Sequence, residues 1–394
     1  MMAFPKLRFK NAEGAEFTSW VTSFIGDECK ITTGNKDTQN KIDGGKYPFF
    51  VRSQTVERIN TYSKDCEAIL TSGDGVGVGK NYHYINGKFD FHQRVYCLYD
   101  FSNQLLGKYL YIYFSNYFFD RVKRLSAKNS VDSVRMDMIS KMEIKLPSLV
   151  EQTKIASFLT AVDEKISQLT QKHQLLSQYK QGMMQKLFSQ QIRFKADDGS
   201  EFGEWDEYSL DTLLSKIIDN RGKTPVTEAN LEIPLIEVNA IGQRRIKYEK
   251  VSKYFSEDTF QNWFRAYLEH QDILFSTVGN TAICSIYTDE IKAGIAQNIV
   301  GLRANTKLIQ PTFLYYLLTE IANNQKFKSI EMQAVQPSIK VSQMIHLTFL
   351  TPCLEEQTKI ANFLSAIDQK IDVASEQLEQ AKLWKKGLLQ QMFV

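Results

Sequence analysis

Cysteine is scarce in this 394-residue chain, and its five cysteines are scattered without a Cys-x-x-Cys pair. The first ten residues, MMAFPKLRFK, lack the apolar core of a secretory signal. Together these two absences predict a reduced, cytoplasmic setting. The most apolar window, residues 110–119, contains Ser115 and Asn116 and is too short to span a bilayer, so no membrane role is expected.

The sequence also lacks the motifs of several enzyme classes. All eight prolines are isolated, so the (N/D/S)-P-P-(Y/F/W) tetrapeptide of amino-methyltransferases cannot occur. The glycine-rich segment 73–80, GDGVGVGK, does not fit G-x-G-x-x-G, and Asn81 stands where a P-loop has Ser or Thr. Segment 222–224 fails as a P-loop because Ile217 occupies the position of the first glycine. The five histidines show no metal-ligand spacing. We therefore expect no catalytic residues, no metal and no cofactor.

The overall composition is that of a folded protein. Hydrophobic residues make up 43% of the chain and charged residues 24%, and the length is sufficient for two or three domains. A net charge of +3 and an isoelectric point near 8.3 permit a nucleic-acid partner without requiring one.

A long internal repeat is the main feature that is present. Residues 147–188 contain EQTKIASFLTAVDEKI and recur at 352–393 as EQTKIANFLSAIDQKI, displaced by 205 positions. The opening segment 7–20 recurs at 192–205, displaced by 185. The duplication thus covers the whole chain, and the second copy carries about twenty additional residues between its opening and closing segments.

The middle of each copy has diverged more strongly. AILTSGDG at 68–75 matches DILFSTVG at 272–279, and Gln93 matches Gln297, all at a displacement of 204. Short β-branched and aromatic runs broken by Gly, Asn and Asp predict strands, interspersed with helical patterns. Each middle is therefore expected to be a mixed α/β domain of about 130 to 150 residues.

The closing segments have the periodicity of long helices. Alternating steps of four and three from Ile155 meet an apolar residue at eight of ten positions, and the same steps from Ile360 meet nine of ten. Each helix of about 40 residues would be about 60 Å long. An exposed stripe would cost about 1.5 to 3 kcal/mol for each large apolar side chain, so each helix needs a partner. The other copy is the nearest candidate, in an antiparallel pair.

Two details follow from the antiparallel register. Lys180 is predicted to lie beside Asp368, and Lys385 beside Asp163. The helices also share a glycine, at positions 182 and 387, although glycine inside a helix costs about 1 kcal/mol relative to alanine. We expect another backbone, that of the neighbouring copy's opening segment, to approach closely at these glycines. A docking notch for a partner protein is the alternative.

The two helices, each preceded by a divergent domain, resemble the specificity subunit of type I restriction-modification enzymes over the full length. The resemblance implies an α+β fold, with two mixed α/β target-recognition domains related by pseudo-twofold symmetry and separated by an antiparallel coiled coil of two long helices. The expected boundaries are 1–146 and 192–351 for the two target-recognition domains, and 147–191 and 352–394 for the two conserved spacer helices.

The resemblance also implies a function. In that family each target-recognition domain reads half of a bipartite DNA sequence, and the coiled coil sets the distance between the halves. The subunit has no catalytic activity. It joins two methyltransferase subunits that use S-adenosylmethionine and, optionally, ATP-driven restriction subunits.

Candidate DNA contacts are clusters of basic and amide side chains, which can form paired hydrogen bonds with guanine or adenine edges. Residues 206–351 contain 15 basic and 16 acidic residues, so we expect partner subunits to supply much of the attraction for phosphates. A solvated surface role is the competing interpretation for each single residue. The candidates are Lys36, Lys41, Arg52, Lys80, Asn81 and His83 in the first domain, and Arg221, Lys223, Thr224, Asn239, Gln243, Arg244, Arg245 and Lys247 in the second.

Two other classes of protein compete with this interpretation. A fused modification or nuclease enzyme is one, although its E-x-K pieces at 28–30 and 143–145 are short and have no acidic partner in a P-D context. A coiled-coil scaffold with duplicated binding domains and no DNA role is the other. DNA retention that requires the methyltransferase subunit would separate a specificity subunit from both.

Overall fold

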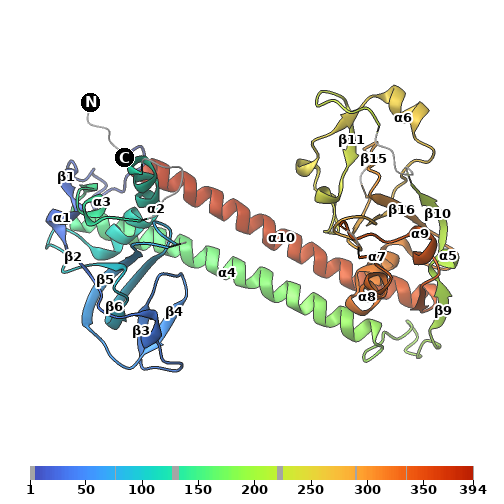
Figure 1. The fold of residues 1–394 in the computed structure, drawn as a ribbon, viewed down its shortest axis with the longest axis horizontal. Helices are drawn as coiled ribbons and strands as arrows, with labels where there is room; N and C mark the ends of the chain where they lie inside the picture. Colours follow the sequence, from blue (N-terminus) through green and yellow to red (C-terminus); the bar gives the residue numbers. More distant parts are fainter. Residues whose placement is uncertain are drawn as a thin grey trace. The chain divides into compact units, whose positions relative to one another are not determined.

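The computed structural model describes residues 5–75, 77–126, 133–219, 225–288, 291–333 and 335–393. The chain forms two compact units, Met1–Gln171 with Ser375–Val394, and Lys172–Ala374. The division falls within both long helices, α4 (Leu149–Phe188) and α10 (Leu354–Met392), so each unit contains part of each helix (Figure 1). In the part of the chain that is described, no helix combines the length and the apolar character needed to cross a membrane.

The first unit is built on a six-stranded sheet in the order β2-β7-β5-β6-β3-β4. Its neighbouring strands are antiparallel except β3 and β6, which are parallel. Helix α2 packs against β5 and β6 through buried aromatic side chains such as Phe114 and Phe118. The sheet strands are β2 (Lys30–Thr33), β3 (Tyr47–Phe50), β4 (Val56–Ile59), β5 (Lys64–Ser72), β6 (Tyr82–Phe91) and β7 (Val95–Tyr99); a two-stranded sheet joins β1 (Val21–Phe24) to β8 (Glu143–Leu146); the helices are α1 (Ile25–Glu28), η1 (Thr38–Asn40), α2 (Gly107–Leu125) and α3 (Met136–Ser140).

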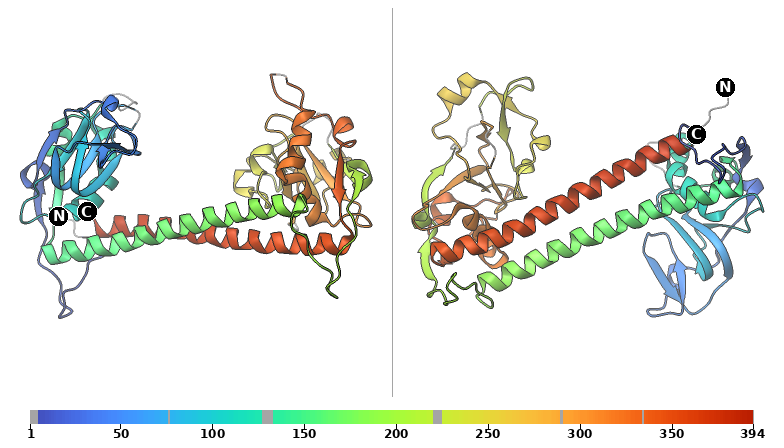
Figure 2. Two further views of the ribbon diagram at one scale, coloured as in Figure 1. Left: turned by 90° about the horizontal axis from the view of Figure 1, so that it is seen from below. Right: turned by 180° about the vertical axis from the view of Figure 1, so that it is seen from behind.

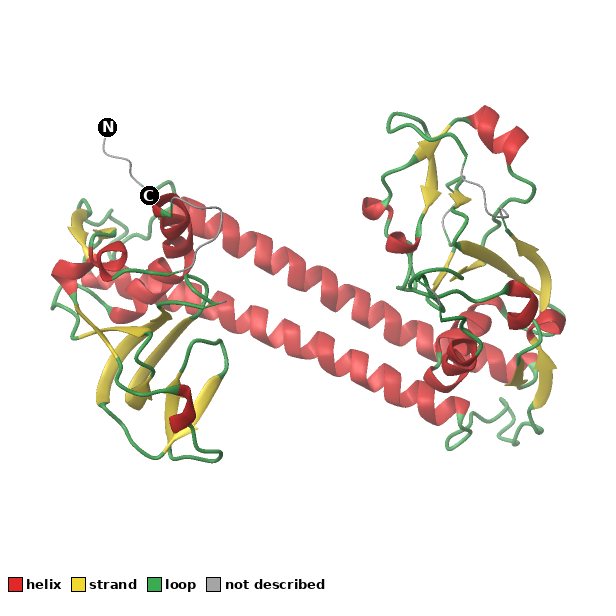
Figure 3. Ribbon diagram, in the orientation of Figure 1, coloured by secondary structure: helices red, strands yellow, loops and turns green. Residues whose placement is uncertain are grey.

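The second unit repeats this plan with smaller sheets (Figure 3). A four-stranded sheet has the order β10-β16-β13-β14, a three-stranded sheet the order β12-β11-β15, and a two-stranded sheet joins β17 to β9. The strands are β9 (Asp206–Ser209), β10 (Leu214–Ile218), β11 (Ile233–Ile236), β12 (Tyr254–Phe255), β13 (Ile273–Ser276), β14 (Cys284–Ile286), β15 (Gly294–Ile295), β16 (Ile299–Ala304) and β17 (Thr348–Thr351); the helices are α5 (Leu210–Leu213), η2 (Val238–Ala240), η3 (Tyr248–Lys250), α6 (Glu257–Trp263), α7 (Pro311–Thr319), α8 (Ile321–Ser329) and α9 (Val341–Met344).

One long strand of the first unit corresponds to two short strands of the second. Strand β6 pairs with β5 along most of its length and with β3 at its end. In the second unit β14 pairs with β13, whereas β15 makes the matching parallel pair with β11. A six-stranded sheet therefore becomes a four-stranded and a three-stranded sheet without a change in the order of the equivalent strands.

The additional residues of the second copy lie at the edge of its three-stranded sheet. Residues 51–55 connect β3 to β4, whereas residues 237–253, which include η2 and η3, connect β11 to β12. Helix α6 follows β12 and has no counterpart after β4. The added length is thus concentrated at one sheet edge.

The long helices meet their own copies as predicted. In the first unit Leu159 and Val162 of α4 share a core with Leu388 and Met392 of α10. In the second unit the end of α4 shares a core with the start of α10. The helices are therefore antiparallel within each unit, as the views in Figures 1 and 2 also show.

Both predicted ion pairs are confirmed. The distance from Lys180 Nζ to Asp368 Oδ1 is 2.6 Å, and that from Lys385 Nζ to Asp163 Oδ1 is also 2.6 Å. The Asp368 carboxylate additionally accepts a hydrogen bond from the Tyr316 hydroxyl at 2.6 Å.

The expectation for the two helix glycines is wrong. A Cβ atom added at Gly182 or Gly387 would meet no described atom within 4 Å. Open space, rather than a neighbouring backbone, lies beside both positions, so packing does not explain why both copies carry glycine here.

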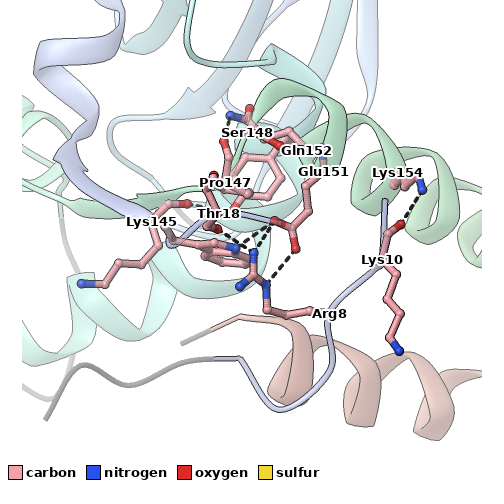
Figure 4. A network of polar contacts seen from close by, with 11 residues as sticks. Arg8, Lys10, Thr18, Lys145, Pro147, Ser148, Glu151, Gln152 and Lys154 are labelled. Atoms are coloured by element: carbon pink, nitrogen blue, oxygen red, sulfur yellow. Dashed lines mark hydrogen bonds and ion pairs between the residues drawn. The ribbon is translucent and has the colours of Figure 1, made fainter. Parts of the chain in front are cut away.

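A buried polar network fastens each long helix to its domain, and we call it the helix-start anchor; Figure 4 shows that of the first unit. In the first unit the Glu151 carboxylate accepts hydrogen bonds from Arg8 Nε (3.0 Å), Arg8 Nη2 (2.8 Å) and Trp20 Nε1 (3.1 Å). The adjacent Gln152 accepts from Leu106 N (2.8 Å) and donates to the Gln104 and Pro147 carbonyls. Neither Glu151 nor Gln152 is exposed to solvent.

The second unit contains the same network. Glu356 accepts from Arg193 Nε (3.1 Å), Arg193 Nη2 (2.7 Å) and Trp205 Nε1 (3.1 Å), while Gln357 accepts from Gln310 N (2.8 Å). These interactions account for the Glu-Gln pair in both copies of the repeated EQTKIA segment.

The opening segments meet the ends of the long helices in the same way. Leu7 N donates to Gln391 O at 3.0 Å, and Ile192 N donates to Lys186 O at 3.3 Å. The first bond joins segments far apart in sequence, whereas the second joins neighbours. The opening segment therefore lies against the end of a long helix in the same way in both units, although that helix is α10 in the first unit and α4 in the second.

Replacing either anchor carboxylate should destabilise its unit. Glu151→Ala and Glu356→Ala leave a partly buried guanidinium and an indole N–H without their acceptor, so we expect each to lower the free energy of unfolding by about 3 to 5 kcal/mol. Urea unfolding provides the measurement. The exposed neighbour Glu355→Ala is the control and should change stability by less than about 0.5 kcal/mol. Equal stability of the anchor and control variants would contradict this role.

Candidate nucleic-acid interface

Charged and amide side chains gather where β3 and β6 end and β7 begins. His92 N donates to Phe50 O at 2.9 Å, and Gln93 N donates to Lys36 O at 2.8 Å, so three chain segments meet here. The Asp74 carboxylate lies 3.0 Å from Arg52 Nη1 and 3.7 Å from Arg94 Nε. We call the set Lys36, Asp37, Arg52, Asp74, Gln93 and Arg94 the first-domain edge cluster.

The buried ring of His92 holds the backbone of Arg94, a member of this cluster, in place. Its Nδ1 accepts a hydrogen bond from Arg94 N at 2.9 Å, which places the proton of the neutral ring on Nε2. Burial, followed by the positive charge of Arg52, lowers the pKa of His92. The Arg94 side chain is 66% exposed above it. An exposed guanidinium on a fixed backbone is suited to guanine edges or phosphates.

The other candidates of the first domain make separate contacts. Lys41 Nζ lies 3.6 Å from Glu57 Oε1, and Lys80 Nζ lies 5.2 Å from the centre of the Phe119 ring. Asn81 Nδ2 donates to Ser72 Oγ at 3.2 Å. His83 is buried, and its Nε2 lies 3.0 Å from Ser53 O. Lys36 and Arg52 thus lie at one corner, and the buried His83 contacts the segment of Arg52, whereas Lys41, Lys80 and Asn81 make their contacts elsewhere.

Candidates in the second domain fall into two groups. Arg221, Lys223 and Thr224 lie outside the described residues. The other five candidates lie in the connection from β11 to β12: Asn239, Gln243, Arg244, Arg245 and Lys247. The apolar residues of this connection, Ala240, Ile241 and Ile246, are buried in a core.

This connection follows the edge of β14 toward α10. Ile286 N donates to Arg244 O at 2.9 Å, and Ser285 Oγ accepts from Gly242 N at 3.0 Å. Arg245 Nε lies 4.0 Å from Asp372 Oδ2 of α10. Asn239 Nδ2 donates to Lys250 O at 3.2 Å. The side chain of Arg245 is still 74% exposed, so the connection presents a basic outer surface over a packed inner one.

Sequence reasoning missed Asp37, Asp74, Gln93 and Arg94 as members of the edge cluster. Their partners come from distant segments, and no local motif marks them. The match of Gln93 with Gln297 was the signal that could have drawn attention to this corner. Across the described residues, no group of three or more His, Cys, Asp or Glu side chains is placed to hold a metal ion.

Comparison with known proteins gives the class of this chain. The model of the type I restriction modification DNA specificity domain matches residues 18–178 and 203–383, so the chain belongs to this family. It is a specificity subunit of a type I restriction-modification system with two target-recognition domains, and it is a DNA-recognition protein rather than an enzyme.

Individual relatives cover nearly the entire chain. The MjaVIII specificity subunit of Methanocaldococcus jannaschii is 26% identical, over 99% of this chain and 96% of that relative. The S subunit structure from M. genitalium has a TM-score of 0.68 at 17% identity and covers 100% of this chain and 99% of that chain. A chain from a structure concerned with complex assembly and conformational transition of the type I R-M system has a TM-score of 0.53 at 13% identity, covering 96% and 98%.

These comparisons confirm the predicted family and fold class. Two mixed α/β domains and a pair of long helices are present, as the resemblance implied. The individual DNA contacts stay predictions.

Acid should destabilise the first unit through His83 and His92. Burial lowers the pKa of both imidazoles below the ordinary value of 6.5. As the pH falls through that value, the unfolded chain binds more protons than the folded chain, so the free energy of unfolding decreases.

The double variant His83→Gln, His92→Gln should therefore lose less thermal stability than the wild type between about pH 7.5 and about pH 5.5. Differential scanning calorimetry measures the difference. The exposed His270→Gln is the control and should follow the wild type. A double variant with the wild-type pH dependence would show that neither imidazole contributes.

Proposed function

We propose that this specificity subunit recognises a bipartite DNA site and positions methyltransferase subunits on it. The observation that carries the proposal is the duplicated helix-start anchor, which fastens each of two divergent α/β domains to one helix of an antiparallel pair. Two domains that share the same anchor but differ at their sheet edges suit the recognition of two different half-sites.

The proposed partners are double-stranded DNA, two methyltransferase subunits and, optionally, restriction subunits. A duplicated chain presents two copies of its conserved surfaces, and two copies of a surface can hold two copies of one partner. The proposed target-recognition domains are residues 1–146 and 192–351, with 147–191 and 352–394 as the spacer helices. The proposed setting is the cytoplasm, where such a complex meets DNA.

The proposed DNA contacts differ in role. Lys36 and Arg52 lie in the first-domain edge cluster, where they can reach base edges or phosphates. We assign phosphate contacts, which position a domain without reading sequence, to the candidates outside this cluster. These candidates are Lys41, Lys80 and Asn81 in the first domain, and Arg221, Lys223, Thr224, Asn239, Gln243, Arg244, Arg245 and Lys247 in the second. His83 is buried with its Nε2 3.0 Å from Ser53 O, so we assign it to the support of the Arg52 segment and not to phosphate binding.

Methylation mapping tests the function. The chain is expressed with the methyltransferase subunit of its own system in cells that lack other methylation, and methylated adenines are located by single-molecule sequencing. We expect one bipartite motif with a fixed unread spacer, and a bandshift on that motif only when both subunits are present. Specific DNA retention without a methylated motif would contradict the positioning role, and no retention would contradict DNA recognition.

Lengthening both spacer helices should lengthen the unread spacer. One heptad inserted after Gln171 and another after Ala374 adds about 10 Å and preserves the apolar seam. Because each base pair adds about 3.4 Å, the spacer in the methylated motif should grow by up to about three base pairs while both half-sites stay the same.

Insertion into one helix alone is the matched control. It breaks the pairing of the seam and should abolish methylation rather than change the spacer. An unchanged spacer in the double insertion would contradict the helices as the element that sets the distance.

A further inference from the structure

The corner that holds the first-domain edge cluster has a counterpart in the second domain. Backbone hydrogen bonds that define this corner recur with partners displaced by 186 to 205 positions. In the first domain the bonds run from Gly73 N to Arg94 O (2.7 Å), from His92 N to Phe50 O (2.9 Å) and from Val134 N to Gly73 O (2.7 Å). Their counterparts in the second domain run, in the same order, from Thr277 N to Asn298 O (2.9 Å), from Ala296 N to Ile236 O (2.9 Å) and from Ile339 N to Thr277 O (2.8 Å).

The bridges around this corner match as well. Asp74 forms an isolated antiparallel bridge with Ser133, and Val278 forms one with Ser338. The turn before β16 therefore has the geometry of the turn before β7. Consequently Gln297 occupies the position of Gln93, and Asn298 occupies the position of Arg94.

Two described positions of the second corner, Val278 and Asn298, carry neutral side chains where the first corner has the charged Asp74 and Arg94. Val278 stands where Asp74 pairs with Arg52 and Arg94 in the first domain. Gln297 is exposed. Asn298 Oδ1 is buried and accepts no hydrogen bond from any described residue, which leaves an unused acceptor beside Gln297.

We propose that Gln297, supported by Asn298, reads base edges in the half-site of the second domain. This assignment rests on the proposed function. A glutamine amide can donate to adenine N7 and accept from adenine N6, whereas an arginine pairs with guanine O6 and N7. The exchange of Arg94 for Asn298 thus directs the second corner toward adenine, and the first corner toward guanine.

The basic β11 to β12 connection is the alternative reader within this domain. Its inner side is packed in a core, and its backbone bonds to the edge of β14 fix its course along the domain. Arg245 lies toward Asp372 of α10. These contacts suit phosphate binding at the side of the domain, and they leave the corner at Gln297 as the site of base recognition.

The test compares three single variants in the complex with the methyltransferase subunit. Each complex methylates a DNA library in which both half-sites are randomised, and the products are sequenced. Gln297→Ala should relax discrimination at one or two positions of one half-site by about 5- to 150-fold, as expected for a lost bidentate pair. Gln93→Ala should relax positions only in the other half-site. Gln243→Ala, in the connection, should lower the methylation rate without changing the preferred bases.

A fourth variant separates base recognition from loss of folding. Gln297→Glu has the same size, and it should disfavour adenine and favour cytosine at the same position, because a carboxylate accepts from cytosine N4. Unchanged preferences in both Gln297 variants, or relaxation by Gln243→Ala instead, would overturn the inference while leaving the function intact. A wild-type complex that selects no bipartite motif would overturn the proposed function itself.

Discussion

The rest of the structure depends on a buried carboxylate in the first turn of each long helix. Glu151 and Glu356 are fully buried, and each is held by an arginine fork and an indole N–H from the opening segment. A carboxylate at this position also interacts favourably with the helix N-terminus. Because a buried charge is tolerated only when it is fully paired, the anchor fixes the opening segment, the helix start and the domain relative to one another within each unit.

A frame fixed in this way allows the sheet edges to vary. The connection at one edge grows from residues 51–55 to residues 237–253, and the strand that is continuous in the first unit is divided in the second. Neither change touches the anchor or the hydrogen bonds that define the corner before β7 and β16. Recognition can therefore diverge between the domains while the mechanical part of the protein is conserved between its two copies.

The features predictable from the sequence are those that local periodicity or repetition encodes. The helices, their antiparallel pairing and both ion pairs follow from a seam that can be followed residue by residue. The anchor was not predictable, because Arg8 and Glu151 are 143 positions apart and no spacing rule connects them. The edge cluster was not predictable for the same reason, because its charged residues come from distant segments of the chain. The prediction of close packing at Gly182 and Gly387 was wrong because the recurrence of a glycine does not show what lies beside it.

The two confirmed ion pairs look alike in sequence but differ in their surroundings. The side chain of Asp163 is 47% exposed, so its pair with Lys385 contributes at most about 1 kcal/mol. The side chain of Asp368 is only 9% exposed and also accepts from the Tyr316 hydroxyl, while burial and this carboxylate raise the pKa of that phenol. The position that matches Tyr316 in the first domain is Ile112, which has no hydroxyl. Asp368 therefore gives the second domain a contact with its helix pair in addition to the anchor, whereas the first domain makes a different one, in which the Tyr117 hydroxyl donates to Leu389 O at 2.8 Å.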